Sequence, residues 1–291
     1  MTTVMDVVRL STKHLADRGV DSPRLDAELL AAHSLGVRRL DLYLQFDRPL
    51  DESELAPIRA LLRRRAGGEP VAYILGQREF YGRTFAVNPA VLIPRPETEL
   101  LIERALSWLR ERQDEGPMGA GLRAADLGTG SGCIAVTLAA EAAGVEVVAV
   151  DVSGKALEVA RGNAARHGVA QRVSFVRGAW WEPIGDGEVD LLVSNPPYVS
   201  DAELATLMRD VREHEPLPAL VAGPDGLDAY RALLRDAPQH LRAGGAVLLE
   251  IAPQRSDRVV ALVRDAWPAA EVSAHVDLAG LARCVEARLP A

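Results

Sequence analysis

Continuously apolar segments alternate with helical ones from residue 123 onward, and this alternation constrains the fold of the 291-residue chain most strongly. Seven short segments are expected to be strands: RAADL, VEVVAV, RVSFV, VDLLVSN, GAVLLEI, EVSAHV and RCVEARL. Strands that are apolar at nearly every position belong to sheets that helices cover on both faces. The pattern therefore predicts an α/β fold built around a seven-stranded, doubly wound sheet.

The first 70 residues show a different pattern, in which apolar residues recur at spacings of three and four. This spacing predicts amphipathic helices over 2–19, 22–36 and 51–68. Ser22 before Pro23 is a typical helix start, and Gly36 is a typical stop. A small helical domain is therefore expected to precede the α/β domain.

Residues 71–96 differ from both neighbouring regions. Aromatic and β-branched residues alternate around Gly76 and Gly82, which predicts the short strands of a hairpin. A helix is expected near Glu97 to Arg110, and the glycine- and charge-rich segment 112–123 predicts an exposed loop. We therefore expect three parts: a helical domain (1–70), a β-hairpin connector (71–96) and an α/β domain (97–291).

Composition narrows the classes of function. The chain is 48% hydrophobic and 25% charged, and no apolar run approaches the roughly 18 residues that a membrane span needs, so we expect a cytoplasmic protein. A net charge of −8 weakens any function that relies on binding nucleic-acid phosphates. The two cysteines form no C-x-x-C pair and the six histidines lack metal-ligand spacing, so neither a disulfide nor a metal site is expected.

The first strand of the α/β domain ends in a glycine-rich turn. The stretch DLGTGSGCIA places Gly128, Gly130 and Gly132 before a predicted helix. Glycines let a ligand approach the backbone, and the free N–H groups at a helix start favour an anionic or polar ligand. Because residue 133 is cysteine, the spacing is G-x-G-x-G and differs from the G-x-G-x-x-G of dinucleotide-binding folds.

Asp151 ends the next predicted strand, 23 positions after Gly128. An acid at that position can accept hydrogen bonds from both ribose hydroxyls of a nucleoside. The alternative is that Asp151 caps the helix that starts near Ser153. The glycine loop and the acid together favour a cofactor with a nucleoside at one end and an amino acid at the other, which fits S-adenosylmethionine.

The apolar strand VDLLVS runs directly into Asn195-Pro196-Pro197-Tyr198, a turn that two prolines make rigid. The planar nitrogen of a base amine or a carboxamide is a poor nucleophile because its lone pair is delocalised. The side-chain oxygen of Asn195 and the carbonyl of Pro196 can accept hydrogen bonds from its two N–H groups. Its lone pair then points at a sulfonium methyl, while Tyr198 offers a face to a planar group. By itself the turn leaves DNA adenine, RNA guanine and protein glutamine open as acceptors.

Over most of residues 69–288 the chain resembles the bacterial peptide chain release factor glutamine methyltransferases, the PrmC/HemK family. The resemblance lies in EPVAYILGQREFYG, LIPRPETELLIE, DLGTGSGCIA, AVDVSGKALEVARGNA, VSNPPYV, EPLPALVAGPDGLDAYR and DLAG. It implies a class I S-adenosylmethionine-dependent methyltransferase domain, Rossmann-like with a mostly parallel seven-stranded sheet, behind a helical domain that docks the protein substrate. The implied reaction methylates the side-chain amide nitrogen of the glutamine in the Gly-Gly-Gln motif of release factors, and a monomer is expected.

The resemblance also implies the site residues at matching positions. The cofactor's methionine portion would contact Gly128, Thr129, Gly130, Ser131 and Gly132. Asp151 would bind its ribose and Trp180 its adenine, although the adjacent Trp181 competes for that role. The substrate glutamine would contact Asn195, Pro196, Pro197 and Tyr198, of which Asn195, Pro196 and Tyr198 are the expected catalytic residues, with Asn195 also beside the cofactor.

Two other functions stay open at this point. A nucleic-acid exocyclic-amino methyltransferase would carry a basic channel and stacking aromatic residues at its cleft, and the net charge speaks against it. A non-catalytic protein-binding module would be expected to lack either Asn195 or the glycine loop, and both are present.

Overall fold

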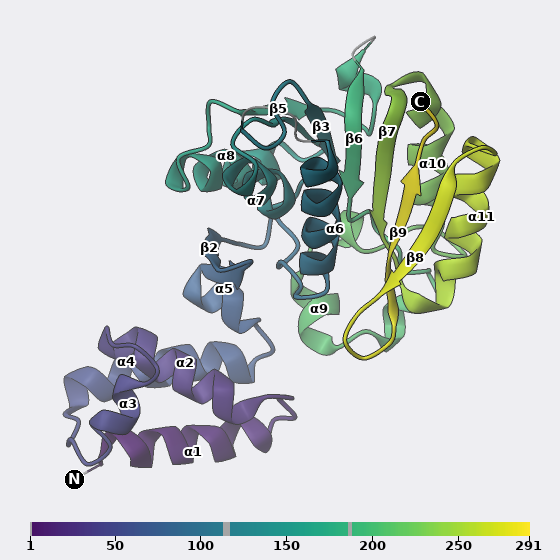
Figure 1. The fold of residues 1–291 in the computed structure, drawn as a ribbon. Helices are drawn as coiled ribbons and strands as arrows, with labels where there is room; N and C mark the ends of the chain where they lie inside the picture. Colours follow the sequence, from purple (N-terminus) through teal and green to yellow (C-terminus); the bar gives the residue numbers. More distant parts are fainter. Residues whose placement is uncertain (1, 113–116, 186–187) are drawn as a thin grey trace. The chain divides into compact units, whose positions relative to one another are not determined.

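The computed structural model describes residues 2–112, 117–185 and 188–291. The chain forms two compact units: an N-terminal unit that ends at Gln77 and also includes Met208–His214, and a second unit of Arg78–Leu207 and Glu215–Ala291. In Figure 1 helices α1 to α5 of the N-terminal unit are purple to blue and its helix α9 is green, and the sheet of the second unit runs from teal to yellow. The predicted boundaries after residues 70 and 96 stay a prediction.

The N-terminal unit is helical. Its elements are α1 (Val4–Ala16), α2 (Pro23–Leu35), α3 (Asp41–Leu44), α4 (Glu52–Ala66), α5 (Val71–Leu75) and α9 (Arg209–His214). Capping boxes begin α1 at Thr3 and α4 at Asp51, because each side chain bonds a free N–H group of the first turn. Pro23 opens α2 and Gly36, in the left-handed conformation, ends it, which confirms the predicted start and stop.

An ion-pair cluster joins the distant segment 208–214 to this unit. Arg65 on α4 is 8% exposed, and its Nε donates to Oδ2 of Asp26 at 2.6 Å. Its Nη2 lies 3.3 Å from Oδ2 of Asp210 on α9. Burial raises the pKa of Asp26, and the Arg65 guanidinium opposes that rise. Removal of either carboxylate would leave a buried charge with fewer partners, so the cluster fixes α9 on the helical unit.

The connector contains a short helix that differs from the expectation. β1 (Gln77–Phe80) and β2 (Arg83–Ala86) form the predicted hairpin through Tyr81 and Gly82, whose φ angles of 48° and 67° suit a tight two-residue turn. Val71–Leu75, however, is helix α5 and ends at Gly76, with φ 69°. A short apolar run suits either state, and here the glycine acts as a helix stop.

The second unit contains the predicted seven-stranded sheet. Its strand order is β5 (Val173–Arg177), β4 (Glu146–Asp151), β3 (Arg123–Leu127), β6 (Val189–Ser194), β7 (Leu241–Glu250), β9 (Ala282–Arg288) and β8 (Glu271–Val276). Neighbours from β5 to β7 are parallel, and β9 is antiparallel to both β7 and β8. The expectation of a mostly parallel α/β sheet is therefore confirmed.

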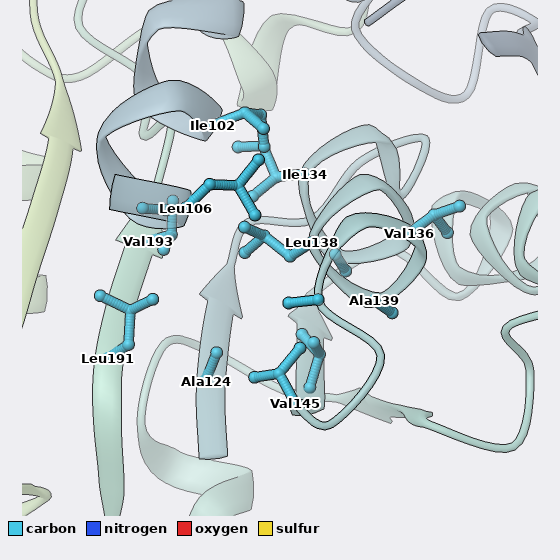
Figure 2. Close-up of a cluster of buried hydrophobic side chains, with 14 of the residues drawn as sticks. Ile102, Leu106, Ala124, Ile134, Val136, Leu138, Ala139, Val145, Leu191 and Val193 are labelled. Carbon is cyan, nitrogen blue, oxygen red and sulfur yellow. The ribbon is translucent and has the colours of Figure 1, made fainter. Parts of the chain in front are cut away.

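Helices cover both faces of this sheet (Figure 1). One face packs against α6 (Thr98–Glu111), α7 (Cys133–Glu141) and α8 (Gly154–Arg166), and the other against α10 (Asp228–Asp236) and α11 (Ser256–Ala266). Successive strand residues point to opposite faces, so Leu191 and Val193 lie in the first core and Leu192 in the second. Figure 2 shows Leu191 and Val193 on the side of Leu106 and Leu138.

The connections of the second unit are irregular. They include the 3-10 helices Glu182–Ile184, Leu204–Thr206, Leu217–Ala219, Ala237–Gln239 and Pro253–Arg255. Of the predicted loop 112–123, residues 113–116 lie outside the described residues, and 118–121 form a turn. In the part of the chain that the structure describes, every helix falls short of the length and apolar character that a bilayer crossing requires.

One buried side chain connects three parts of the second unit. Asn163 on α8 is fully buried, and its Nδ2 donates to the carbonyls of Ala86 at 3.0 Å and Ser131 at 2.8 Å. Its Oδ1 accepts the Ala86 N–H at 2.8 Å. The hairpin strand β2 and the glycine loop are therefore both held on α8.

Replacement of Asn163 by leucine is expected to lower the free energy of unfolding by roughly 2–4 kcal/mol, because buried backbone groups of Ala86 and Ser131 lose their partners. The neighbouring Gly162→Ala is a matched control. Gly162 is exposed on the same helix, and a Cβ there would meet no atom within 4 Å. Gly162→Ala should raise stability by about 0.5–1 kcal/mol. Urea unfolding followed by circular dichroism measures both, and wild-type stability of Asn163→Leu would contradict the assigned role.

Candidate active site

The order of the strands places the candidate site. From β3 the sheet continues through β4 and β5 on one side, and through β6 and β7 on the other. Open α/β sheets bind ligands beyond the carboxyl ends of the strands at such a reversal of order. The glycine loop follows β3 and Asn195 follows β6, so both predicted motifs lie at this edge.

A cavity of about 230 Å³ lies at the same edge. The glycine loop lines it through Gly128 and Gly130, and the Asn195 turn lines it through Asn195 and Pro197. Asp151 and Trp180 also belong to the lining. The rest of the lining is mostly apolar: Ala90, Val91, Leu92, Val150, Val152, Ser153, Ala156, Gly178, Pro216, Pro218 and Ala219. The structure therefore brings the loop, the strand-end acid and the carboxamide together around one hollow.

The loop needs its glycines for two reasons. Gly128, Gly130 and Gly132 have φ angles of 84°, 56° and 78°, which other residues rarely adopt. In addition, a Cβ on Gly132 would lie 3.0 Å from the Cβ of Ala160 on α8. Gly132 therefore permits close packing of the loop on α8, whereas Gly128 and Gly130 line the cavity.

Buried polar side chains outside the cavity lining hold the glycine loop in place. Oδ2 of Asp126 accepts hydrogen bonds from the Thr129 hydroxyl at 2.6 Å and the Ala135 N–H at 3.1 Å. Burial raises the pKa of Asp126 to about 7, and these two bonds oppose the rise. Thr129 and Ser131, both expected beside the cofactor, are 4% and 2% exposed and do not belong to the cavity lining. Both side chains therefore lie away from the cavity, and that of Thr129 holds the loop through its hydrogen bond to Asp126.

Asp151 lies where the sequence analysis expected it, at the end of β4. Its Oδ2 accepts the Gly130 N–H at 2.9 Å, and its Oδ1 accepts the Ser153 N–H at 2.8 Å. Burial raises its pKa, and both bonds act in the opposite direction. Ser153, through a hydrogen bond from the Ala156 N–H, is the residue that caps α8. The capping alternative for Asp151 is therefore wrong, and its carboxylate keeps acceptor positions for hydroxyl groups in the cavity.

The two adjacent tryptophans occupy different environments. Trp181 is 2% exposed, its Nε1 donates to the Leu233 carbonyl at 2.8 Å, and its ring stacks on His240 with centroids 4.9 Å apart. Trp180 lines the cavity and has φ 49°, an uncommon backbone conformation for a bulky residue. Trp181 is thus a core residue, and Trp180 is the ring of this pair that a ligand in the cavity can contact.

The Asn195 turn presents one polar side chain to the cavity. Nδ2 of Asn195 donates to Oγ1 of Thr98 at 3.2 Å, which among the described residues leaves Oδ1 as its free acceptor group. Pro197 lines the cavity beside it, whereas Pro196 is buried. Tyr198 packs against the hydrophobic core between the sheet and helices α10 and α11. Burial raises the pKa of Tyr198 to about 12, so the phenol stays protonated at neutral pH.

Two walls of the cavity were not expected from the sequence: residues 90–92, and residues 216, 218 and 219. Glu215, which is 5% exposed, holds them together: its carboxylate accepts the Ile93 N–H at 3.2 Å and pairs with Arg95 at 2.6 Å. Both walls lie within or next to stretches that carry the family resemblance. That resemblance was the available signal, but it assigned no role to these positions.

Metal and thiol chemistry find no support at this site. Within the described ranges, no group of three or more His, Cys, Asp or Glu side chains is placed to hold a metal ion. Cys133 and Cys284 carry free thiols. Burial raises the pKa of Cys133 to about 12 and also raises that of Cys284. Both thiols therefore stay protonated and are poor nucleophiles at neutral pH.

Comparison with known proteins agrees with this architecture. Residues 6–76 match the family model described as the PrmC N-terminal domain, and residues 109–213 match the methyltransferase small domain. Among solved structures, the 16S rRNA N2 G1207 methyltransferase of T. thermophilus, in complex with AdoMet and guanosine, is 19% identical with a TM-score of 0.53. The likeness covers 73% of this chain and 49% of that one, and it shows the fold alone.

Curated relatives match over nearly the whole chain. The release factor glutamine methyltransferase of Nitratidesulfovibrio vulgaris is 46% identical over 98% of this chain and 95% of its own length. The enzyme of the same name from Cereibacter sphaeroides is 45% identical over 98% of both chains. The fold is that of a class I methyltransferase, and the chain belongs to the release factor glutamine methyltransferase family.

Proposed function

We propose that this methyltransferase transfers the methyl group of S-adenosylmethionine to the side-chain amide nitrogen of the glutamine in the Gly-Gly-Gln motif of peptide chain release factors. The observation that carries the proposal is that Gly128, Asp151 and Asn195 line one cavity, in a chain of this family. The loop and the acid suit a nucleoside cofactor, and the carboxamide suits an acceptor that carries N–H groups.

The residues around the cavity fit the parts of S-adenosylmethionine. Asp151 offers a carboxylate to ribose hydroxyls, and Trp180 offers an apolar ring to a purine. The glycine loop precedes α7, whose first N–H groups favour a carboxylate. A Cβ at Gly130 would meet no protein atom within 4 Å, so the loop leaves space beside it. When bound, this cofactor supplies a methyl group on a sulfonium sulfur, which is a good leaving group.

The chain's own contribution is to orient the acceptor. A carboxamide nitrogen is a weak nucleophile because its lone pair is delocalised, and its two hydrogens need fixed acceptors. Oδ1 of Asn195 and the carbonyl of Pro196 are the proposed acceptors, and the proline ring restricts how far that carbonyl moves. Well-oriented reactants supply roughly 7–11 kcal/mol of barrier reduction. The N–C bond forms as the S–C bond breaks, and the nitrogen then loses one proton to water.

The proposal extends to partners and location. The N-terminal helical unit docks the release factor, and the enzyme acts as a monomer in the cytoplasm without binding nucleic acid directly. The net charge of −8 supports the last point, because nucleic-acid binding relies on cations that neutralise phosphates. The same charge disfavours the nucleic-acid methyltransferase alternative.

The acceptor is tested with labelled S-adenosylmethionine and a release factor in two forms, with the native Gly-Gly-Gln motif and with Gly-Gly-Ala. The native motif should take up one methyl group per chain, and the Gly-Gly-Ala form should take up none, because it lacks the carboxamide. Mass spectrometry of the motif peptide locates the methyl group. Equal labelling of both forms would exclude this glutamine as the acceptor.

Asn195→Ala should lower kcat by about 100-fold or more, because one of the two fixed acceptors is lost at the reacting nitrogen. Cofactor affinity, measured by calorimetry, should change by less than about threefold, since this contact acts on the substrate. Wild-type turnover in this variant would remove Asn195 from the mechanism.

The two tryptophans provide a matched pair. Trp180→Ala should weaken cofactor binding about tenfold, because the cavity loses its aromatic wall, and should leave the unfolding midpoint close to that of the wild type. Trp181→Ala should lower the free energy of unfolding by about 3–5 kcal/mol, because it empties a core position. Calorimetry and urea unfolding measure the two effects, and a stability loss in Trp180→Ala without weaker cofactor binding would reverse the assignment.

A further inference from the structure

The exposed apolar side chains of the second unit gather at one edge of its sheet. Within its described residues, the large apolar side chains that are exposed are those of Val152, Leu217, Val276, Leu278 and Leu281. Val152 directly follows β4 and lines the cavity, and Leu217 stands between Pro216 and Pro218, which also line it. Single exposed apolar residues are normal on a protein surface, whereas a group of them beside a ligand cavity indicates an interaction surface.

The end of β8 and the loop that follows it supply three of these side chains, and we call residues 276–281 the β8–β9 tip. Strand β9 is antiparallel to β7 and pairs Cys284 with Glu250, the last residue of β7, so the residues before β9 lie beyond the carboxyl end of β7. Strand β8 is antiparallel to β9 and therefore ends at the same edge. Figure 1 shows the yellow loop between β8 and β9 beyond the end of the sheet toward which β6 points. The tip thus lies at the edge that carries the candidate site.

One carboxylate holds the tip in shape. Oδ1 of Asp277 accepts the N–H groups of Ala279 at 2.9 Å and Leu281 at 3.0 Å. Its Oδ2 accepts a hydrogen bond from Nε of Arg283 at 2.9 Å. Leu278 projects from this loop with its side chain fully exposed. Because the loop is already held by its own hydrogen bonds, a partner that contacts Leu278 orders little additional chain, which lowers the entropic cost of binding.

Short contacts connect the tip with the Asn195 turn. Arg283, which pairs with Asp277, also has its Nη2 3.9 Å from Oε1 of Glu97. Glu97 is the N-cap residue of α6, and the next residue, Thr98, accepts the hydrogen bond from Asn195. The tip therefore lies near the side of the cavity that Asn195 lines.

The proposed reaction indicates what covers this surface. Its acceptor is a single side chain of a protein, so the remainder of that protein lies outside the cavity and against its rim. The charge of the tip narrows the choice further. Asp277 is the only charged residue of 276–281, and its bonds within the loop and to Arg283 occupy both of its oxygens. An apolar surface without free cations suits an uncharged protein segment and does not suit the phosphates of a nucleic acid.

We propose that the β8–β9 tip is a docking surface for the substrate protein, at which Leu278 and Leu281 contact an uncharged, apolar segment that flanks the acceptor glutamine. The inference rests on the proposed function, because it requires an acceptor that a protein presents. It gives the release factor a contact on the second unit in addition to the N-terminal helical unit. Such a contact holds the substrate equally in the ground state and in the transition state, so its loss raises the KM for the release factor and leaves kcat in place.

The contact is tested with Leu278→Ser, which removes the apolar side chain. The KM for the release factor should rise about five- to tenfold, while kcat and the KM for S-adenosylmethionine stay within about twofold of the wild type. Leu278→Met keeps an apolar side chain of similar volume and should return the release-factor KM to within about twofold. Since Leu278 is fully exposed, both variants should unfold at the urea midpoint of the wild type. A wild-type release-factor KM in Leu278→Ser would overturn the proposal.

The occupant of the tip is identified with the photoreactive residue p-benzoylphenylalanine in place of Leu278. The variant is irradiated with a release factor and S-adenosylhomocysteine, and mass spectrometry locates the cross-link. An extended chain covers about 3.5 Å per residue, so the cross-link should fall in the release factor within about ten residues of the Gly-Gly-Gln motif. A cross-link to a distant part of the release factor or to a second copy of this chain would contradict the assignment, and so would the lack of any cross-link to the release factor.

The outcomes separate two failures. Absence of methylation at the glutamine by the wild-type enzyme would contradict the proposed function itself. Wild-type methylation together with an unchanged release-factor KM in Leu278→Ser, or with a methionine variant as impaired as the serine one, would overturn the docking role of the tip alone.

Discussion

The parallel pairing of β3 with β6 is the interaction on which the rest of the site depends. Ala124, Ala125 and Asp126 pair with Leu191, Leu192 and Val193 in register, and the order of the strands reverses at this pair. Since parallel strands end at the same edge, the residues that follow them emerge side by side. The glycine loop and the Asn195 turn therefore meet without any long connection, and a one-residue shift in this register would send each apolar side chain to the wrong face.

Buried polar side chains then fix loops that regular secondary structure does not hold. Asp126 bonds the glycine loop, Asn163 bonds that loop to the hairpin, and Glu215 bonds two walls of the cavity. Thr98 bonds Asn195 in the same way. Burial of such groups is costly unless they are paired, and the raised pKa values of Asp126 and Glu250 reflect that cost. The reacting groups are thus positioned before a ligand binds, which is how a site without a strong base can promote methyl transfer.

The sequence predicted the parts whose signals are local. Apolar strands, the glycine spacing and the Asn-Pro-Pro-Tyr turn each lie within a few residues, and the fold class and family followed from them. It could not decide between Trp180 and Trp181, because neighbouring aromatic residues differ only in the direction that tertiary packing gives them. It also missed the attachment of α9, because Arg65 and Asp210 are 145 residues apart. Helix α5 was missed because its short apolar run suits a strand equally well.

The central claim is that a rigid acceptor pair aims a carboxamide nitrogen at a methyl group held by the neighbouring glycine loop. The most direct measurement is a crystal structure of the enzyme with S-adenosylhomocysteine and a peptide that contains Gly-Gly-Gln. The account predicts the cofactor product against Gly128 and Asp151, with the glutamine nitrogen bonded to Oδ1 of Asn195 and the Pro196 carbonyl and in line with the sulfur. A glutamine nitrogen that binds away from Asn195, or a cofactor product outside the Gly128 loop, would contradict it.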